Sequence, residues 1–137
     1  MTAEQAVRAA FGAALRAGLG GRVNAVLEGA GGRTTAPWAT IGDVLAIDWG
    51  TKTAAGRELR VTVTIRDSAE TPARLEGLMA LAEDAIAGMP RALEGWRVAS
   101  LAFVRSRIGR DGAGAGNAAA TGGWIGLVEH RVRVLAQ

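Results

Sequence analysis

Residues 57–66 read RELRVTVTIR, and this stretch decides the fold class. Apolar side chains alternate in it with charged residues and threonines, which is the pattern of a strand that buries one face. The apolar face consists of Leu59, Val61, Val63 and Ile65. A one-sided strand of this kind needs further strands beside it and a covering layer over its apolar face.

The preceding residues 38–49, WATIGDVLAIDW, also predict a strand, and the segment GTKTAAG joins them to residues 57–66. This connection is short and contains glycine, which is typical of a β-hairpin. Simple alternation predicts that the apolar side chains of the first strand share one face. These side chains are Ile41, Leu45, Ile47 and Trp49.

Two amphipathic helices are predicted around the hairpin. The first begins at Thr2, with Gln5 placed for a capping box, and Gly18 is a plausible end. The second begins with Thr71 as N-cap and Pro72 at the first helical position, and it ends near Gly88 and Pro90. The buried stripes are Val7, Phe11, Ala14 and Leu15 in the first helix, and Leu75, Leu78, Met79, Ala82, Ile86 and Met89 in the second.

Residues 96–108 and 124–135 predict two more strands, with a Gly/Ala-rich loop at 109–123 between them. In the last strand, His130 shares the apolar face with Val128 and Val132. The short apolar piece 23–27 is either a minor strand or an extended link. The pattern therefore predicts a single α+β domain over residues 1–137, with a mainly antiparallel four-stranded sheet, two helices packed on one of its faces and long Gly-rich loops.

Composition narrows the chemistry. The 137 residues include no cysteine, which excludes disulfides, thiolate nucleophiles and zinc–cysteine sites. The net charge of +3 is weak support for nucleic-acid binding, because strong binders concentrate basic residues in a stripe. The N-terminus lacks the apolar region of a signal peptide, and the glycine-interrupted stretch 112–128 cannot form a membrane helix, so we expect a soluble protein without membrane contact.

The turn Asp48-Trp49-Gly50-Thr51 resembles the phosphate-binding turn of sugar-kinase and actin-like ATPases, and the opening of Holliday-junction resolvase-like nucleases. The kinases need two large lobes, and the nucleases need further carboxylates that converge with the first aspartate on a metal. The chain has no P-loop, because its only lysine, Lys52, follows Thr51. A polar hairpin tip, without cofactor or metal, is the favoured interpretation. A small RNase H-like nuclease using Asp48 remains an alternative.

His130 is the only histidine, and a core or interface role is favoured over catalysis because no nucleophile or ligand set accompanies it. Arginines alternate along the predicted strands and favour a solvated sheet face. An Arg-rich nucleic-acid-binding module is the second alternative. The arginines are Arg60, Arg66, Arg97, Arg105, Arg107, Arg131 and Arg133.

Residues 36–66, APWATIGDVLAIDWGTKTAAGRELRVTVTIR, carry a family resemblance. A Pro-aromatic strand start, an Asp-Trp-x-Thr-Lys-Thr tip and a Gly-Arg-Glu segment resemble the signature of the tail completion, or tail terminator, proteins of the siphophage head–tail joint. The later parts also agree, including EGWRVASLAFVRSR, the turn Arg110-Asp111-Gly112 and the closing GLVEHRVRVLAQ. The sequence departs from the pattern at Gly50, at Arg66 and in the length of residues 113–123.

The resemblance implies a non-enzymatic structural protein of a phage or gene transfer agent particle, assembled in the bacterial cytoplasm. Such proteins form a hexameric ring that caps the tail tube protein and joins it to the head–tail connector. DNA would pass through the lumen without specific binding. We expect residues 29–36 and 109–123 to be arms that order against neighbours. Candidate contact residues are Asp48, Trp49, Thr51, Lys52, Thr53, Arg57, Arg110 and Asp111.

Overall fold

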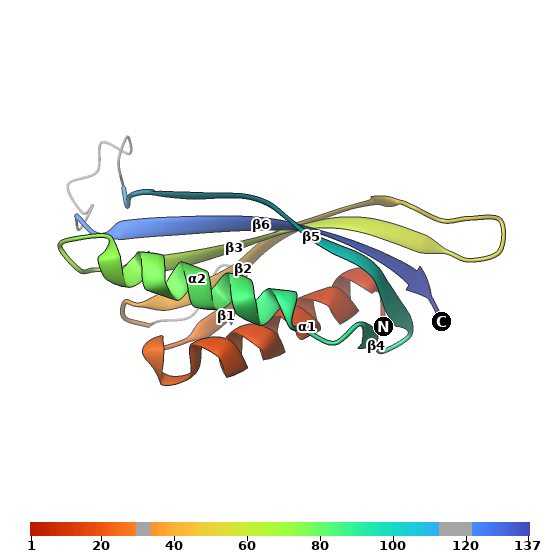
Figure 1. Ribbon diagram of the computed structural model, residues 1–137, viewed down its shortest axis with the longest axis horizontal. Coiled ribbons are helices and arrows are strands. Elements are labelled where there is room, and N and C mark those ends of the chain that lie inside the picture. Colours follow the sequence, from red (N-terminus) through yellow and green to blue (C-terminus); the bar gives the residue numbers. More distant parts are fainter. Residues whose placement is uncertain (30–33, 113–121) are drawn as a thin grey trace.

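Two helices lie along one face of a long, twisted sheet in the computed structural model, which describes residues 1–29, 34–112 and 122–137 (Figure 1). The strands are ordered β1-β2-β3-β6-β5-β4 across the sheet. The elements are α1 (Ala3–Leu19), a 3-10 turn η1 (Gly20–Arg22), β1 (Val26–Glu28), β2 (Trp38–Asp48), β3 (Gly56–Asp67), α2 (Ala73–Ala87), β4 (Ala92–Leu93), β5 (Trp96–Arg110) and β6 (Trp124–Ala136).

The predicted hairpin is confirmed, and it forms one side of the sheet. β2 pairs with β3 in antiparallel register, and β3 pairs with β6 along its whole length from Gly56 to Asp67. The four alternating apolar residues of β3 are fully buried beneath the helices: Leu59, Val61, Val63 and Ile65. Burial of this face against α1 and α2 is the main source of stability, because transfer of apolar surface out of water dominates folding.

The predicted four-stranded, mainly antiparallel sheet is wrong. The sheet has six strands and is mixed, because β1 runs parallel to β2, with Val26 opposite Ala39 and Glu28 opposite Ile41. β1 and β4 hold only three and two residues, which is too short for a periodic pattern to be recognised. Their positions follow from tertiary hydrogen bonds such as Ala39 N to Ala25 O at 3.0 Å.

β2 contains a bulge that the alternation did not predict. Ile41 pairs with Val63, but the next pair is Val44 with Val61, so Gly42 and Asp43 together face a single residue of β3. An extra residue reverses the alternation beyond it. The predicted common face is therefore wrong for Leu45 and Ile47, which are 65% and 53% exposed on the side away from the helices.

α1 stabilises the bulge and is itself capped as predicted. Arg8 on α1 donates to the carbonyl oxygens of Gly42 at 3.1 Å and Ile41 at 3.4 Å. Thr2 and Gln5 form the predicted capping box, with Gln5 N donating to Thr2 Oγ1 at 3.1 Å. The helix passes the predicted end and stops at Leu19.

α2 starts one residue later than predicted. Pro72, not Thr71, occupies the N-cap position and makes no side-chain cap. An ion pair to a buried carboxylate holds this end of the helix: Arg74 Nε donates to both carboxylate oxygens of Asp67, at 3.1 and 3.0 Å. Within the described residues, neither helix has the length and apolar character needed to span a membrane.

Candidate functional site

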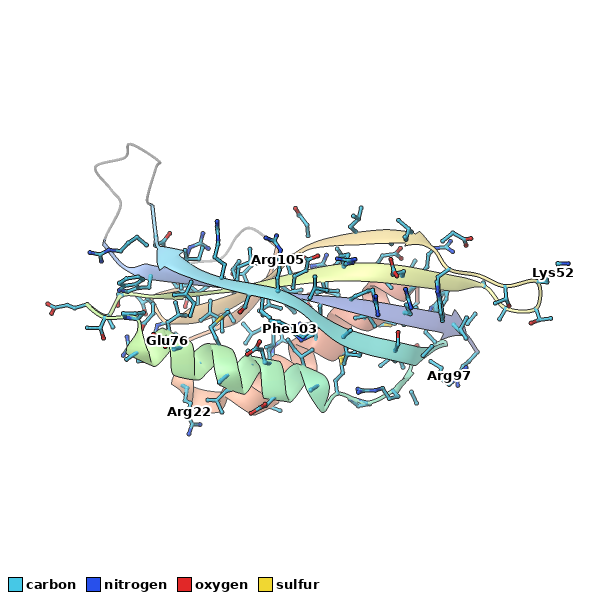
Figure 2. The ribbon with its side chains drawn as sticks, turned by 45° about the horizontal axis from the view of Figure 1, so that its top comes forward. Arg22, Lys52, Glu76, Arg97, Phe103 and Arg105 are labelled. Atoms are coloured by element: carbon cyan, nitrogen blue, oxygen red, sulfur yellow. The ribbon has the colours of Figure 1, made fainter. Side chains whose placement is uncertain are left out.

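The β2–β3 hairpin tip extends well beyond the helical layer, and Lys52 lies at its extremity (Figure 2). The turn is closed by Thr51, whose backbone N donates to Ala54 O at 2.8 Å and whose Oγ1 accepts from Ala54 N at 3.1 Å. Asp48 Oδ1 accepts from Gly50 N at 3.4 Å and lies 3.5 Å from Arg57 Nη1. These contacts give a self-supporting polar turn with its side chains exposed.

The base of the tip is fixed more firmly than its end. Trp49 lies beneath the guanidinium of Arg133, with 5.4 Å between the Arg133 Cζ and the ring centroid. Trp49 N donates to Gly56 O at 3.1 Å, and a side chain at Gly56 would come within 2.7 Å of the Trp49 carbonyl oxygen. The hairpin therefore requires a glycine where the two strands approach.

Arg110 and Asp111 lie at the other end of the sheet. Arg110 pairs with Trp124 of β6, and Trp124 pairs in turn with Asp67 at the end of β3. The hairpin tip lies at the start of β3, beside Gly56. From Gly56 to Asp67 the chain takes eleven steps of about 3.3 Å, so the hairpin tip and the Arg110–Asp111 turn are roughly 36 Å apart. Arg110 Cζ lies 4.9 Å from the Trp124 ring centroid, and Asp111 forms an ion pair with Arg66 at 3.3 Å. The structure thus divides the predicted contact residues into two distant groups.

The predicted arms are only partly visible. Residues 30–33 and 113–121, which form the centres of the segments 29–36 and 109–123, lie outside the described residues. Where the chain is described again, Asp111 N donates to Gly123 O at 2.8 Å, and Arg110 Nη1 donates to Gly122 O at 2.7 Å. These hydrogen bonds join the described residues on either side of the second segment.

The geometry around Asp48 gives no support to the nuclease alternative. Its carboxylate is 82% exposed and contacts the cation of Arg57. Across residues 1–29, 34–112 and 122–137, no three His, Cys, Asp or Glu side chains are grouped to hold a metal ion. Metal-assisted cleavage needs such a converging set of carboxylates.

The sheet face opposite the helices carries arginine and glutamate in paired rows. Glu129 on β6 accepts from Arg105 of β5 at 2.8 Å and from Arg60 of β3 at 3.2 Å. Arg133 donates to Glu58 at 2.9 Å. The hydrogen bond from Arg105 is the main reason that the pKa of Glu129 is lowered. Because these arginines are neutralised locally, they do not form the uncompensated stripe that strong nucleic-acid binders show.

His130 lies in the core, as predicted, between the edges of two aromatic rings. Its ring centroid is 6.1 Å from that of Phe11 and 6.0 Å from that of Phe103. Burial lowers the pKa of the imidazole, so the ring is neutral near pH 7. Its Nδ1 has no hydrogen-bond partner among the described residues. The arrangement is that of a packing residue.

The sequence pattern did not predict which apolar side chains are exposed. Apart from Met1, the exposed large hydrophobic side chains of the described residues lie on two strands, β2 and β5. They are Leu45, Ile47, Phe103, Val104 and Ile108. β2 and β5 lie near opposite edges of the sheet. Phe103 and Arg105 project from β5 in Figure 2. The exposure of these side chains follows from the β2 bulge and from the strand order. Alternation in the sequence predicts neither of them.

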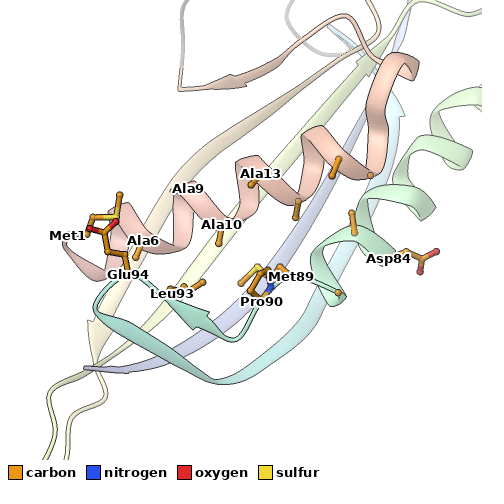
Figure 3. A pocket seen from close by; sticks show the side chains of 15 residues that line it. Met1, Ala6, Ala9, Ala10, Ala13, Asp84, Met89, Pro90, Leu93 and Glu94 are labelled. Carbon is orange, nitrogen blue, oxygen red and sulfur yellow. The ribbon is translucent and has the colours of Figure 1, made fainter. Parts of the chain in front are cut away.

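An apolar groove is lined by residues of α1, α2 and β4 (Figure 3). Six of its fifteen lining residues are alanines of α1. Met1, Met89 and Leu93 add further apolar surface, and Asp84 and Glu94 are its two carboxylates. The lining includes no histidine, serine or lysine. The groove therefore offers mainly apolar contact area.

The comparison with protein families decides what kind of protein this is. The family model described as "Tail completion protein gp17" matches residues 5–121. The chain belongs to the tail completion protein gp17 family. No curated protein matches the sequence significantly. Among solved structures, a chain of "Virion of native gene transfer agent (GTA) particle" superposes with a TM-score of 0.70 and 22% identity, covering 98% of this chain and 95% of that chain.

Family membership confirms the resemblance seen in residues 36–66. A tail completion protein is a structural component of a phage-like particle. The similarity to the virion chain shows that the fold, including the long sheet with helices on one face, is shared at low sequence identity.

Proposed function

We propose that the chain forms a hexameric ring that terminates the tail tube and joins it to the head–tail connector of a phage or gene transfer agent. The family match over residues 5–121 carries this proposal. The fold shared with a chain of a gene transfer agent virion supports it, over almost the whole length of both chains.

The surfaces of the molecule suit such a role. The hairpin tip projects from one end of the sheet, and the Arg110–Asp111 turn lies at the other. In the proposed ring, the tip residues Asp48, Trp49, Thr51, Lys52, Thr53 and Arg57 contact a neighbouring subunit or the tail tube protein. The Arg110–Asp111 end contacts the adjoining layer, and DNA passes through the lumen without specific binding.

The decisive experiment is removal of the coding sequence from a cell that produces the particles. Electron microscopy should then show heads without attached tails and tails of irregular length, and expression of the chain from a plasmid should restore joined particles. Normal particles in the deletion strain would overturn the proposal. Native mass spectrometry of the purified chain tests the hexamer directly.

The two alternatives make different predictions. A metal-dependent nuclease requires cleavage of branched DNA that disappears in Asp48→Asn. A nucleic-acid-binding module requires DNA affinity that falls steeply with salt. We expect neither activity, because Asp48 is exposed and paired with Arg57, and because Arg60, Arg105 and Arg133 are paired with glutamates.

A further inference from the structure

The two open edges of the sheet differ in what they expose, and both lack a full-length neighbour. β4 pairs with β5 only at Trp96 and Arg97, so the described part of β5 beyond Val98 has a strand on one side alone. Within the described part of the chain, β1 covers β2 only from Ala39 to Ile41, and Val44–Asp48 has a strand on one side alone. An open edge presents unpaired backbone donors and acceptors that can accept another strand.

The charges of the two edges are opposite. β5 reads WRVASLAFVRSRIGR, and its four charged residues are all arginine. β2 reads WATIGDVLAID, and its two charged residues, Asp43 and Asp48, are both acidic. Exposed apolar side chains accompany the charges on both strands, with Leu45 and Ile47 on β2 and Phe103 and Ile108 on β5. The acidic β2 edge is therefore complementary in charge to the basic β5 edge, and both edges expose apolar side chains.

We propose that the β5 edge of one copy pairs with the β2 edge of the next copy, so that the sheet continues from subunit to subunit. This inference rests on the proposed ring. The contact joins two different surfaces, and such a head-to-tail contact closes into a ring when its rotation permits. Both edges belong to the same protomer, so each copy can contact one neighbour through its β5 edge and another through its β2 edge.

The strand directions are compatible with this contact. β2, β3, β6 and β5 are successively antiparallel, so β2 and β5 run in opposite directions within one copy. Placing a second copy side by side, in the same orientation, sets its β2 antiparallel to the first copy's β5. Antiparallel pairing uses hydrogen bonds that run perpendicular to the strands, and it is the commoner arrangement in sheets.

The complementarity also holds on each face of the sheet. On the face away from the helices, β2 presents Asp43 and Leu45, while β5 presents Arg105 and Arg107. On the helix face, Phe103 pairs with His130 in register and remains 52% exposed at the edge. Residues on one face of two paired strands meet side by side, which brings the carboxylate of Asp43 toward Arg107 of the neighbouring β5. Arg105 is already paired with Glu129, whereas neither Asp43 nor Arg107 forms an ion pair within the described residues.

Disulfide trapping tests the contact, because the native chain has no cysteine. Leu45→Cys is mixed with Arg105→Cys, Arg107→Cys or Gly109→Cys, three successive positions on the corresponding face of β5. In antiparallel pairing the first of these mixtures is the register that sets Asp43 opposite Arg107, and the other two are shifted from it. Assembled protein is oxidised mildly, and cross-linked dimers are measured by non-reducing electrophoresis. A disulfide needs Cα atoms within about 7 Å, so at least one mixture should cross-link. Leu45→Cys mixed with Gly77→Cys, on the exposed face of α2, is the matched control.

Charge reversal gives an independent readout. Asp43→Arg and Arg107→Glu should each weaken self-association about tenfold or more at low salt, and the double variant should recover much of the loss. Thermal unfolding of each variant separates loss of association from loss of folding. Rings that form normally in every variant, with no cross-link above the control, would overturn the edge contact and leave the ring intact. A wild-type chain that never assembles, even in particles, would instead overturn the proposed ring.

Discussion

Gly18 on α1 lies directly against Ala85 on α2: a Cβ atom at position 18 would come within 2.4 Å of the Ala85 Cβ. The two helices therefore approach each other through a residue without a side chain. This close approach positions both helices over the same face of the sheet, where they bury the apolar residues of β3 and β6.

Gly18→Ala should destabilise the protein by about 1–3 kcal/mol, because an added methyl group must push the helices apart. Gly77→Ala is the matched control, since Gly77 is exposed on α2 and a Cβ there meets nothing within 4 Å. That control should stabilise by about 0.5–1 kcal/mol through helix propensity. Denaturant unfolding followed by circular dichroism measures both. Equal effects of the two substitutions would show that the helices do not meet at Gly18.

Asp67→Ala should cost about 1–3 kcal/mol of folding free energy, because it removes a buried acceptor and leaves polar partners unpaired. The Asp67 side chain is fully buried and accepts from Arg74 and from Ser68 N, the latter at 2.9 Å. Asp48→Ala, at an exposed ion pair, should change stability by about 0.5 kcal/mol or less. Chemical denaturation compares the two. A larger effect for Asp48→Ala would contradict the assignment of Asp67 as the structural carboxylate.

The same pair sets a pH dependence at the acid end. The hydrogen bond from Arg74 lowers the pKa of Asp67, and the hydrogen bond from Arg105 lowers that of Glu129. A carboxyl group whose pKa is lowered on folding stabilises the fold above its unfolded pKa of about 4 and loses that contribution as pH falls further. Below about pH 4, Asp67→Ala should therefore show a shallower loss of melting temperature than the wild type.

His130 should add a separate decline in stability at milder pH. Burial lowers its pKa from the ordinary 6.5, so the unfolded chain takes up a proton before the native chain does. Stability should fall as pH drops from 7 through 6.5 and toward the lower native pKa. Since His130 is the only histidine, His130→Leu should remove this part of the pH profile. A profile between pH 7 and 5 that is unchanged in the variant would refute the assignment.

The charged groups near His130 do not alter that sign. Glu83, Asp84 and Arg91 line the same shallow pocket beside Phe103, but burial alone accounts for the lowered pKa. In the leucine variant at pH 7, the orphaned Nδ1 is replaced by apolar atoms, so stability should be maintained within about 1 kcal/mol.

Lys52→Glu should reduce assembly without unfolding the chain. Lys52 lies at the exposed end of the hairpin tip, and surface substitutions of this kind usually change stability by about 0.5 kcal/mol or less. Arg22→Glu alters net charge equally and lies by the helices, far from the tip. Native mass spectrometry should show fewer assembled rings for Lys52→Glu than for Arg22→Glu. Equal assembly of the two variants would remove the tip from the interface.

The sequence by itself determined the elements with strong periodicity. The alternation in residues 57–66 and 124–135 and the apolar stripes of both helices predicted long elements with one buried face, and these are confirmed. Each such element is specified by its own residues, because burial of one face imposes a period of 2 or 3.6 on the side chains. The hairpin-tip pattern was also local enough to reveal the family before the fold was known.

Only the tertiary structure decided the edges of the sheet. β1 and β4 are too short to carry a period, and their pairing depends on backbone hydrogen bonds to distant strands. The bulge at Gly42–Asp43 turned Leu45 and Ile47 outward, because one extra residue reverses every side chain that follows. The separation of Asp48 from Asp111, and the opposite charges of the two open edges, are consequences of strand order. Strand order depends on contacts between residues far apart in the chain, which no local pattern encodes.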